Sequence, residues 1–301
     1  MHHDLPDLPA EVIERIIDAP GVSSHRETLL ACSEVGRAWH VRSMVHLFRV
    51  LEVVHGEAQN SWRWYSSQSP ESGGRAKEEA FIRVTPDELL DQLLTDYVHL
   101  VRYVQHLLIS SGFGDGDDGP NPHANLLMDP RFRFPKDHRI TRLTVTGSAF
   151  HIPDPHESIN QDALLGNFNK LTQLRMSGVH FIHAGCFTGF LSIFKTLRNL
   201  DLSYSHIHGN IGHGTYEKPT FLRPVNVVLR PDINSLDSIG VALAWMETGG
   251  IMRFGEVSLD AVIPSDANER NLYATVLSAP KISRELISVL KLNLIWQRWT
   301  G

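Results

Sequence analysis

A glycine-rich run near the middle of the sequence is the first stretch whose residue types suggest chemistry. Gly114-Asp115-Gly116-Asp117-Asp118-Gly119 matches the Gly-x-Gly-x-x-Gly pattern of dinucleotide-binding loops. Its three aspartates would repel a pyrophosphate, and Pro120 and Pro122 oppose the helix whose N-terminus would bind one. A calcium loop is disfavoured too, because Pro120 stands where that loop needs a turn glycine. The run therefore predicts an acidic, solvated loop.

Histidine and cysteine provide the other candidates. The chain has 17 histidines, of which His206, His208 and His213 lie close together in a glycine-rich stretch. Two imidazoles at i and i+2 can share a metal only if a third ligand joins them. Cys186 has no histidine arrangement typical of a nucleophile pair, and no Gly-x-Ser-x-Gly elbow is present. We expect no metal, no cofactor and no enzyme, with a hydrolase using His206 or Cys186 as an alternative.

The first fifty residues have the clearest pattern of structural elements. Residues 8–18 predict a short helix with Pro9 in its first turn and Pro20-Gly21 as its stop. Its apolar positions Val12, Ile13, Ile16 and Ile17 fall on one face. Ser24-His25-Arg26-Glu27 has the form of a capping box that opens a second helix, and a third apolar set follows from Trp39 to Phe48. Three such short helices bury little surface alone. We expect part of their apolar surface to contact another chain or the rest of this one.

These helices resemble an F-box of the type abundant in fungal F-box proteins. The residues that carry the resemblance are Leu8-Pro9, Glu11-Val12-Ile13, Ile16-Ile17-Asp18, Leu30, Cys32-Ser33, Val35, Arg37-Ala38-Trp39, Arg42 and His46-Leu47-Phe48. The alternative for this stretch is an N-terminal helical cap on a larger domain. Gly36 departs from the family, since many relatives have cysteine there. Glycine lowers helix stability by roughly 0.5–1 kcal/mol relative to alanine, so the second helix is expected to be weak or to end early.

The resemblance implies a binding partner. In F-box proteins the corresponding positions contact the small Skp-type adaptor of a cullin–RING ubiquitin ligase. Carried over by position, the adaptor-binding residues are Leu8, Pro9, Val12, Ile13, Ile16, Val35 and Trp39.

The sequence changes character after the helical start. Residues 55–84 are rich in Ser, Gly and other turn formers and predict a polar linker, with Trp62, Trp64 and Tyr65 anchoring a loop onto a neighbouring domain. Thr85-Pro86-Asp87-Glu88 then predicts a helix start, followed by a helix to Tyr97 and a strand over residues 103–109.

A recurring apolar-x-apolar pattern follows, which is typical of leucine-rich repeats. Its copies are Leu107/Ile109, Leu143/Val145, Leu174/Met176, Leu200/Leu202, Val227/Leu229 and Val257/Leu259. Successive spacings of 36, 31, 26, 27 and 30 residues mostly exceed the ~20–29 residues of regular repeats. The pattern therefore predicts an irregular solenoid. Residues 187–194 predict a helix on its convex side, and residues 282–294 a helix and final strand, with Trp296 and Trp299 as possible caps.

Composition limits the class of protein. The chain of 301 residues is 42% hydrophobic and 21% charged, which is ordinary for a globular protein with about two domains. Its net charge of -6 disfavours a nucleic-acid partner. No run approaches eighteen apolar residues and the N-terminus lacks a signal-peptide pattern, so we expect no membrane span and an intracellular protein, cytoplasmic or nuclear.

Together these patterns predict an α/β protein with an N-terminal three-helix F-box (residues 1–54), a polar linker (55–84) and an irregular leucine-rich-repeat-like solenoid (85–301). The expected function is a substrate-recruiting adaptor that binds a Skp-type protein, and through it a cullin, at one end and a target protein at the other. The alternative is a leucine-rich-repeat scaffold or regulator without ligase engagement. Positions beside the strands are the candidate target contacts, namely Gln173, Arg175, Asn199, Asp201, Asn226 and Val228.

Overall fold

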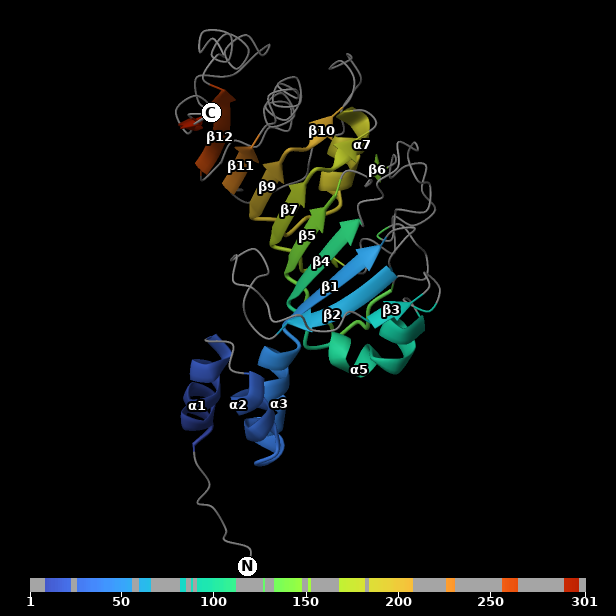
Figure 1. Ribbon diagram of the computed structural model, residues 1–301, viewed down its shortest axis with the longest axis vertical. Helices are drawn as coiled ribbons and strands as arrows, with labels where there is room; N and C mark the ends of the chain where they lie inside the picture. Colours follow the sequence, from blue (N-terminus) through green and yellow to red (C-terminus); the bar gives the residue numbers. More distant parts are fainter. Residues whose placement is uncertain are drawn as a thin grey trace, which may run out of the picture.

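The computed structural model shows a mixed α/β protein with a mostly parallel sheet (Figure 1). It describes residues 9–22, 26–55, 60–65, 82–84, 88, 91–111, 127, 133–147, 151–152, 168–181, 184–207, 226–230, 256–264 and 290–297. Two hydrophobic clusters account for most of the buried side chains, a small one in the N-terminal helices and a large one against the sheet.

Three helices form the N-terminal end, namely α1 (Ala10–Val22), α2 (Arg26–Ser33) and α3 (Arg37–Leu47). Figure 1 shows them grouped below β1 and β2, with α3 leading directly into β1. Ile17, Leu29 and Leu47, one from each helix, form their buried core. So small a core leaves the unit with little hydrophobic stabilisation of its own.

The sequence predicted that Pro20-Gly21 ends the first helix and that Gly36 shortens the second. The prediction that Pro20-Gly21 stops the first helix is wrong, because α1 continues to Val22. The φ of proline is compatible with a helix, and near a helix end it removes only one hydrogen bond. The second helix does end early, at Ser33, so that Val35 lies in a turn. Gly36 has an extended backbone and precedes α3.

Ten strands form the main sheet. They are β1 (Val50–His55), β2 (Asn60–Tyr65), β3 (Ile82–Val84), β4 (His106–Ser111), β5 (Arg142–Thr146), β7 (Gln173–Ser177), β9 (Asn199–Ser203), β11 (Asn226–Arg230), β12 (Glu256–Pro264) and β13 (Leu290–Gln297). Their order is β3-β2-β1-β4-β5-β7-β9-β11-β12-β13, in which β1, β2 and β3 pair antiparallel and every other pair is parallel. Successive strands from β4 onward are therefore neighbours in space.

The six apolar-x-apolar copies predicted as strands all lie in strands, which confirms them. The first apolar residues of the six copies are also paired across neighbouring strands. Leu107 pairs with Leu143, Leu143 with Leu174, Leu174 with Leu200, Leu200 with Val227 and Val227 with Val257. Parallel strands lie ~4.8 Å apart, so the side chains from Leu107 to Val227 form a continuous apolar row. The predicted last strand is confirmed as β13, and the predicted helix that precedes it lies outside the described residues.

A shared carbonyl, one whose oxygen accepts two hydrogen bonds, fixes the start of each of the strands β5, β7 and β9. Gln105 O accepts from the N–H groups of both Thr141 and Arg142, at 3.0 Å each. In the same way Thr141 O accepts from Thr172 and Gln173, and Thr172 O from Arg198 and Asn199. Each strand therefore begins at a position set by the preceding one.

The predicted polar linker over residues 55–84 is wrong for His55, which ends β1, and for residues 60–65 and 82–84, which are strands β2 and β3. Residues 50–54 of the predicted helical domain also lie in β1. Trp62 and Trp64 alternate along β2 and so share one face. Trp62 is buried, with its ring 4.8 Å from that of Tyr97, and Trp64 lies 5.2 Å from Phe48. This alternation, which turn-forming neighbours obscured, extends the sheet toward the N-terminal helices.

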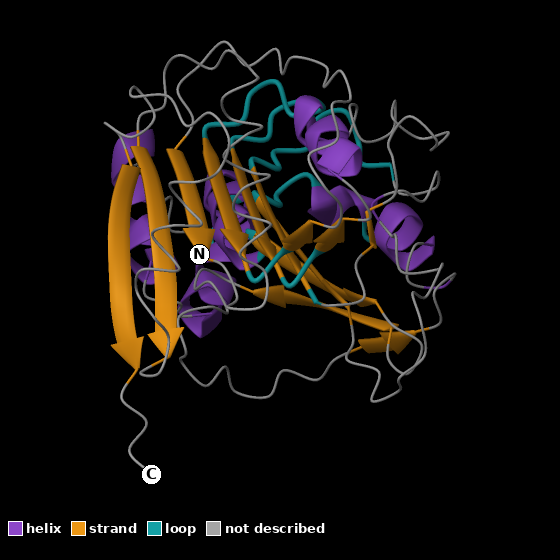
Figure 2. Cartoon of the chain, turned by 90° about the horizontal axis from the view of Figure 1, so that it is seen from above, coloured by secondary structure: helices purple, strands orange, loops and turns teal. Residues whose placement is uncertain are grey.

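The buried side of the sheet is covered by short elements. They are η2, a π-helix (Gln92–Asp96), α5 (Val98–Val101), α7 (Ala184–Ser192) and a three-stranded parallel sheet of β6 (His151–Ile152), β8 (His180–Phe181) and β10 (His206–Ile207). Figure 2 shows α7 and the described loops on one side of the main sheet. The predicted helix over 187–194 is confirmed in α7, although it begins at Ala184 and ends at Ser192. Within the helix expected up to Tyr97, Glu88 and Asp91 are α-helical and the end is η2, with α5 following it. The predicted cap Thr85 lies outside the described residues.

Leu174→Ala should test the shared core. Leu174 is 1% exposed in the central row of the sheet, and we expect the free energy of unfolding to fall by about 2–5 kcal/mol because a cavity replaces packed methyl groups. Lys195→Ala, at an exposed position, should change it by less than about 0.5 kcal/mol. Urea unfolding followed by circular dichroism measures both, and equal effects would contradict this assignment of the core.

Candidate functional site

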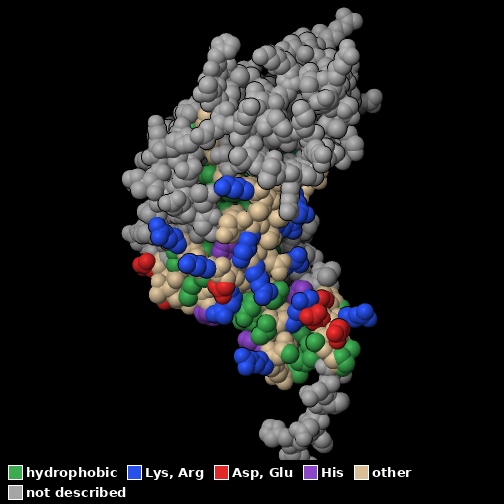
Figure 3. All heavy atoms as spheres, turned by 180° about the vertical axis from the view of Figure 1, so that it is seen from behind, with side chains coloured by type: hydrophobic (Ala, Val, Ile, Leu, Met, Phe, Trp, Pro, Cys, Tyr) green, Lys and Arg blue, Asp and Glu red, His purple; other side chains and the backbone are tan. Residues whose placement is uncertain are grey.

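Exposed apolar side chains gather on the N-terminal helices and form what we call the helical patch. Its members are Val12, Ile16, Leu30, Val35 and Val41, each 40–50% exposed. Figure 3 shows hydrophobic side chains at the surface of this end of the molecule. Large aliphatic side chains concentrated on so small a unit are typical of a protein contact surface.

The spacing of apolar residues along α1 explains the patch. Ile13 and Ile17 point to the core of the three helices, where Ile17 is fully buried. Val12 and Ile16 also lie four residues apart, on the adjacent stripe, and remain exposed. Since α1 is apolar over two stripes and its own chain covers one, the other is available to a partner.

The structure separates the predicted adaptor-binding residues into two groups. Pro9, Val12, Ile16 and Val35 are exposed, and Pro9 O accepts from the N–H groups of Val12 and Ile13 at 2.9 and 3.2 Å. Ile13 and Trp39 are half-buried and pack on the helical core. Leu8 lies outside the described residues.

Leu30 and Val41 belong to the helical patch but were absent from the predicted contacts. Both stand among the apolar residues of the second and third helices, where periodicity alone did not separate the outward from the inward positions.

An ionic cluster holds α1 against α3. Arg42 donates to both carboxylate oxygens of Asp18, at 2.8 and 2.7 Å, and His46 Nε2 lies 2.8 Å from Asp18 Oδ1. The hydrogen bond from Arg42 lowers the pKa of Asp18 to about 2, against the opposing effect of burial. The Asp18 carboxylate raises the pKa of Arg42 in turn. The cluster therefore fixes the helix that carries Val12 and Ile16.

Asp18→Asn should weaken the helical unit at neutral pH by about 1 kcal/mol, a value limited by solvent screening of the partly exposed pair. Because the folded-state pKa of Asp18 is lowered, its contribution is present above pH ~4 and is lost as the pH falls toward 2. Hydrogen exchange of the α1 amides from pH 7 to 2 measures the change.

Glu14→Gln is the matched control, since Glu14 is 4.0 Å from Arg42 and more exposed than Asp18. We expect a change below about 0.5 kcal/mol. Equal protection of wild type and Asp18→Asn at pH 7 would contradict a stabilising role for the cluster.

The six predicted target contacts lie together on three adjacent strands of the main sheet. Gln173, Asn199 and Asn226 occupy one register row, and Arg175, Asp201 and Val228 the row two residues further on. Asn226 is exposed and the other five are half-buried. Alternation therefore places all six on the face opposite the apolar rows, and we call this surface the polar face.

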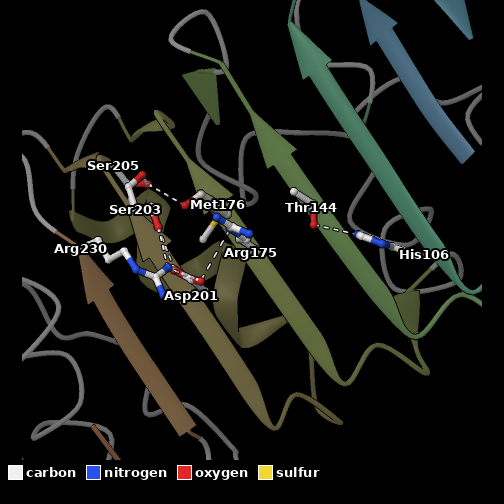
Figure 4. Close-up of polar contacts among 8 residues, drawn as sticks. All are labelled: His106, Thr144, Arg175, Met176, Asp201, Ser203, Ser205 and Arg230. Carbon is white, nitrogen blue, oxygen red and sulfur yellow. Dashed lines mark hydrogen bonds and ion pairs between the residues drawn. The ribbon is translucent and has the colours of Figure 1, made fainter. Parts of the chain in front are cut away.

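Hydrogen bonds connect the side chains of the polar face across strands (Figure 4). Asn226 Nδ2 donates to Asn199 Oδ1 at 3.0 Å, and Arg142 Nε donates to Gln173 Oε1. Arg230 Nη1 donates to Asp201 Oδ1 at 2.7 Å, and Ser203 Oγ donates to the same oxygen at 2.9 Å. Such a network holds the side chains in fixed positions, which suits recognition of a partner.

His106 is a buried histidine of the same face. Its Nε2 lies 2.9 Å from Thr144 Oγ1 of the neighbouring strand. Burial lowers the pKa of His106 to about 4, with further effects from the positive charges of Arg142, Arg49 and Arg175. His106 is therefore neutral at pH 7 and acts as a hydrogen-bonding side chain.

His106 should make the stability of the sheet depend on pH. The folded-state pKa lies below the ordinary 6.5, so the stabilisation is complete above pH ~6.5 and decreases by roughly 3 kcal/mol as the pH falls to ~4. An imidazole NMR titration should give a midpoint near 4, and His106→Gln should remove this part of the pH dependence. Thr144→Val should retain it, because burial is the main cause. A midpoint near 6.5 would contradict the prediction.

Cys186 and His206 are the residues of the alternative in which the chain is a hydrolase. Cys186 is fully buried within α7, and the ring of His206 lies 4.7 Å from that of His180. Among the described residues, no group of three His, Cys, Asp or Glu side chains could hold a metal ion. The glycine-rich run 114–119, His208 and His213 lie outside the described residues.

The described helices include none with the length and apolar character needed to cross a membrane. A comparison with protein-family models and with curated protein sequences finds no match to the chain.

Proposed function

We propose that the chain is a substrate-recruiting adaptor subunit of a Skp–cullin–F-box ubiquitin ligase. The three N-terminal helices would be an F-box that binds a Skp-type adaptor, and the parallel sheet with its covering elements a leucine-rich-repeat-like solenoid that binds a target protein. The observation that carries the proposal is the helical patch, whose aliphatic residues on the three short helices and on the turn between α2 and α3 remain exposed in the folded chain.

The positions of the exposed residues support adaptor binding. Val12, Ile16 and Val35 coincide with positions for which the F-box resemblance implies contact with the adaptor, and the chain's own sheet does not cover them. Because these side chains are already about half-buried, complete burial of each contributes about 1 kcal/mol, roughly half of the value for a fully exposed side chain. Several such residues together are sufficient for a stable protein interface, in which a few buried side chains supply most of the affinity.

The parallel sheet and its polar face support target binding. Consecutive parallel strands in one register, separated by 26–36 residues of sequence, are the arrangement expected of a repeat protein. The polar face then presents an ordered array of Arg, Asp, Asn and Gln side chains. Catalysis would belong to the other subunits, since holding a target lysine near a charged ubiquitin carrier raises its effective concentration.

Binding of the purified full chain to a purified Skp-type adaptor tests the proposal by isothermal titration calorimetry. Ile16→Asp should weaken binding at least tenfold, because a carboxylate replaces a buried aliphatic group. Arg15→Asp places the same carboxylate at the neighbouring exposed position of α1, and we expect it to bind like wild type.

Absence of adaptor binding by the folded wild-type chain would overturn the proposal. Partners captured through the polar face by that same chain would then favour the scaffold or regulator without ligase engagement. Equal weakening by Ile16→Asp and Arg15→Asp would show that the helical patch is not the contact.

A further inference from the structure

Basic side chains gather where the parallel strands begin. The loops that enter β4, β5, β7 and β9 (residues 102–105, 133–141, 168–172 and 194–198) contain Asp137 as their one acidic residue. Their exposed basic residues are Arg102, Arg133, Lys136, Arg139, Lys170, Lys195 and Arg198, and all of these except Arg133 form what we call the basic edge. Figure 3 shows Lys and Arg side chains running through the described middle of the molecule. This local excess contrasts with a net charge of -6 for the whole chain.

Within the described part of the chain, the basic edge is not neutralised by ion pairs. Arg102 Nε donates to His99 O at 2.8 Å, and Lys170 Nζ to His138 O at 3.3 Å. These two contacts are with uncharged carbonyls, so among the described residues no ion pair compensates the positive charges of the basic edge. They are therefore available to an anionic partner.

The shared carbonyls fix the spacing of the basic edge. Thr141, Thr172 and Arg198 are successive residues of that hydrogen-bonded row, and adjacent strands lie ~4.8 Å apart. Arg139 and Lys170 both stand two residues before their row position, so they are equivalent residues of neighbouring repeats. From the loop of β4 to that of β9 the edge spans three strand intervals, or ~14 Å, which an extended peptide covers in about four or five residues.

The neighbours of these cations select the class of partner. Anchoring in a membrane surface needs exposed apolar groups beside the charges, yet Ile140, Leu171 and Leu197 of these loops are 0–2% exposed. Sequence-tolerant binding of single-stranded nucleic acid relies on several exposed aromatic rings that stack on successive bases. In these loops Phe134, Phe168 and Phe194 are at most 8% exposed, and one aromatic residue, Tyr103, is half-buried. Binding of the carboxylates of an acidic peptide requires only basic side chains, and an arginine can bind one carboxylate through two hydrogen bonds.

We propose that the basic edge binds an acidic segment of a partner protein, an extended run of Asp and Glu that crosses the starts of β4 to β9. The role of this site rests on the proposed function, in which the acidic segment belongs to the target. The edge is distinct from the helical patch, so an acidic segment and the adaptor occupy different surfaces.

A fluorescein-labelled peptide with six consecutive glutamates between Gly-Ser flanks is the probe, titrated with the full chain at 50 mM salt and followed by fluorescence anisotropy. Arg139→Gln/Lys170→Gln should weaken binding about three- to tenfold, the effect of losing two exposed charge contacts. Arg15→Gln/Arg37→Gln removes the same charge at exposed positions of α1 and α3 and should bind the peptide like wild type. Addition of Arg198→Gln to the first variant should weaken binding further.

Several outcomes would overturn the inference. They are equal binding of a peptide with glutamine in place of glutamate, equal weakening by the two double variants, and binding of a ten-nucleotide single-stranded DNA or of phosphatidylserine vesicles in preference to the peptide. Adaptor binding by Arg139→Gln/Lys170→Gln should remain at the wild-type value. If the wild-type chain binds the adaptor but not the glutamate peptide, the proposed acidic partner is wrong and the proposed ligase function stands. If the wild-type chain does not bind the adaptor, the proposed ligase function is wrong.

Discussion

The structure depends on one constraint, the common register of the apolar residues along the parallel strands. Leu107, Leu143, Leu174 and Leu200 follow one another across the sheet, and each is 0–1% exposed. A shift of one strand by a single residue would move its apolar set to the polar face. The same register therefore forms the core on one side and aligns the Arg, Asp, Asn and Gln side chains on the other.

The N-terminal helices are stabilised differently from the sheet. Their core of three fully or nearly buried side chains is small, and the Asp18–Arg42–His46 cluster adds a polar connection between α1 and α3. A unit of this size gains stability from any partner that binds only the folded form. Under the proposed function, adaptor binding would both use the helical patch and stabilise the helices that present it.

The sequence predicted the repeating strands well, because alternation and leucine spacing reflect burial directly. It did so even for Val227/Leu229 and Val257/Leu259, where no leucine precedes the strand at the expected place. It failed at β2, since the polar residues around Trp62 and Trp64 are typical of a linker and the strand's partners lie elsewhere in the chain. It also failed to separate the buried from the exposed residues of the first helix. The four aliphatic residues have the same character in the sequence, and only their packing shows that Ile17 is buried and Ile16 exposed. The basic edge could not be predicted as a unit, since its residues are separated by up to about a hundred positions and only the strand order brings them together.

The shared carbonyls at the strand starts have a consequence for how such a chain can change over evolution. Thr141 O binds two amide groups of the next repeat, as do Gln105 O and Thr172 O, so a residue inserted just before β5, β7 or β9 would break two hydrogen bonds at once. A residue inserted after a strand's carboxyl end disturbs none of them, and loop closure becomes only slowly less favourable with length. Extra length is therefore best tolerated after the carboxyl ends of the strands, which is compatible with spacings of 26 to 36 residues between strands that keep one register.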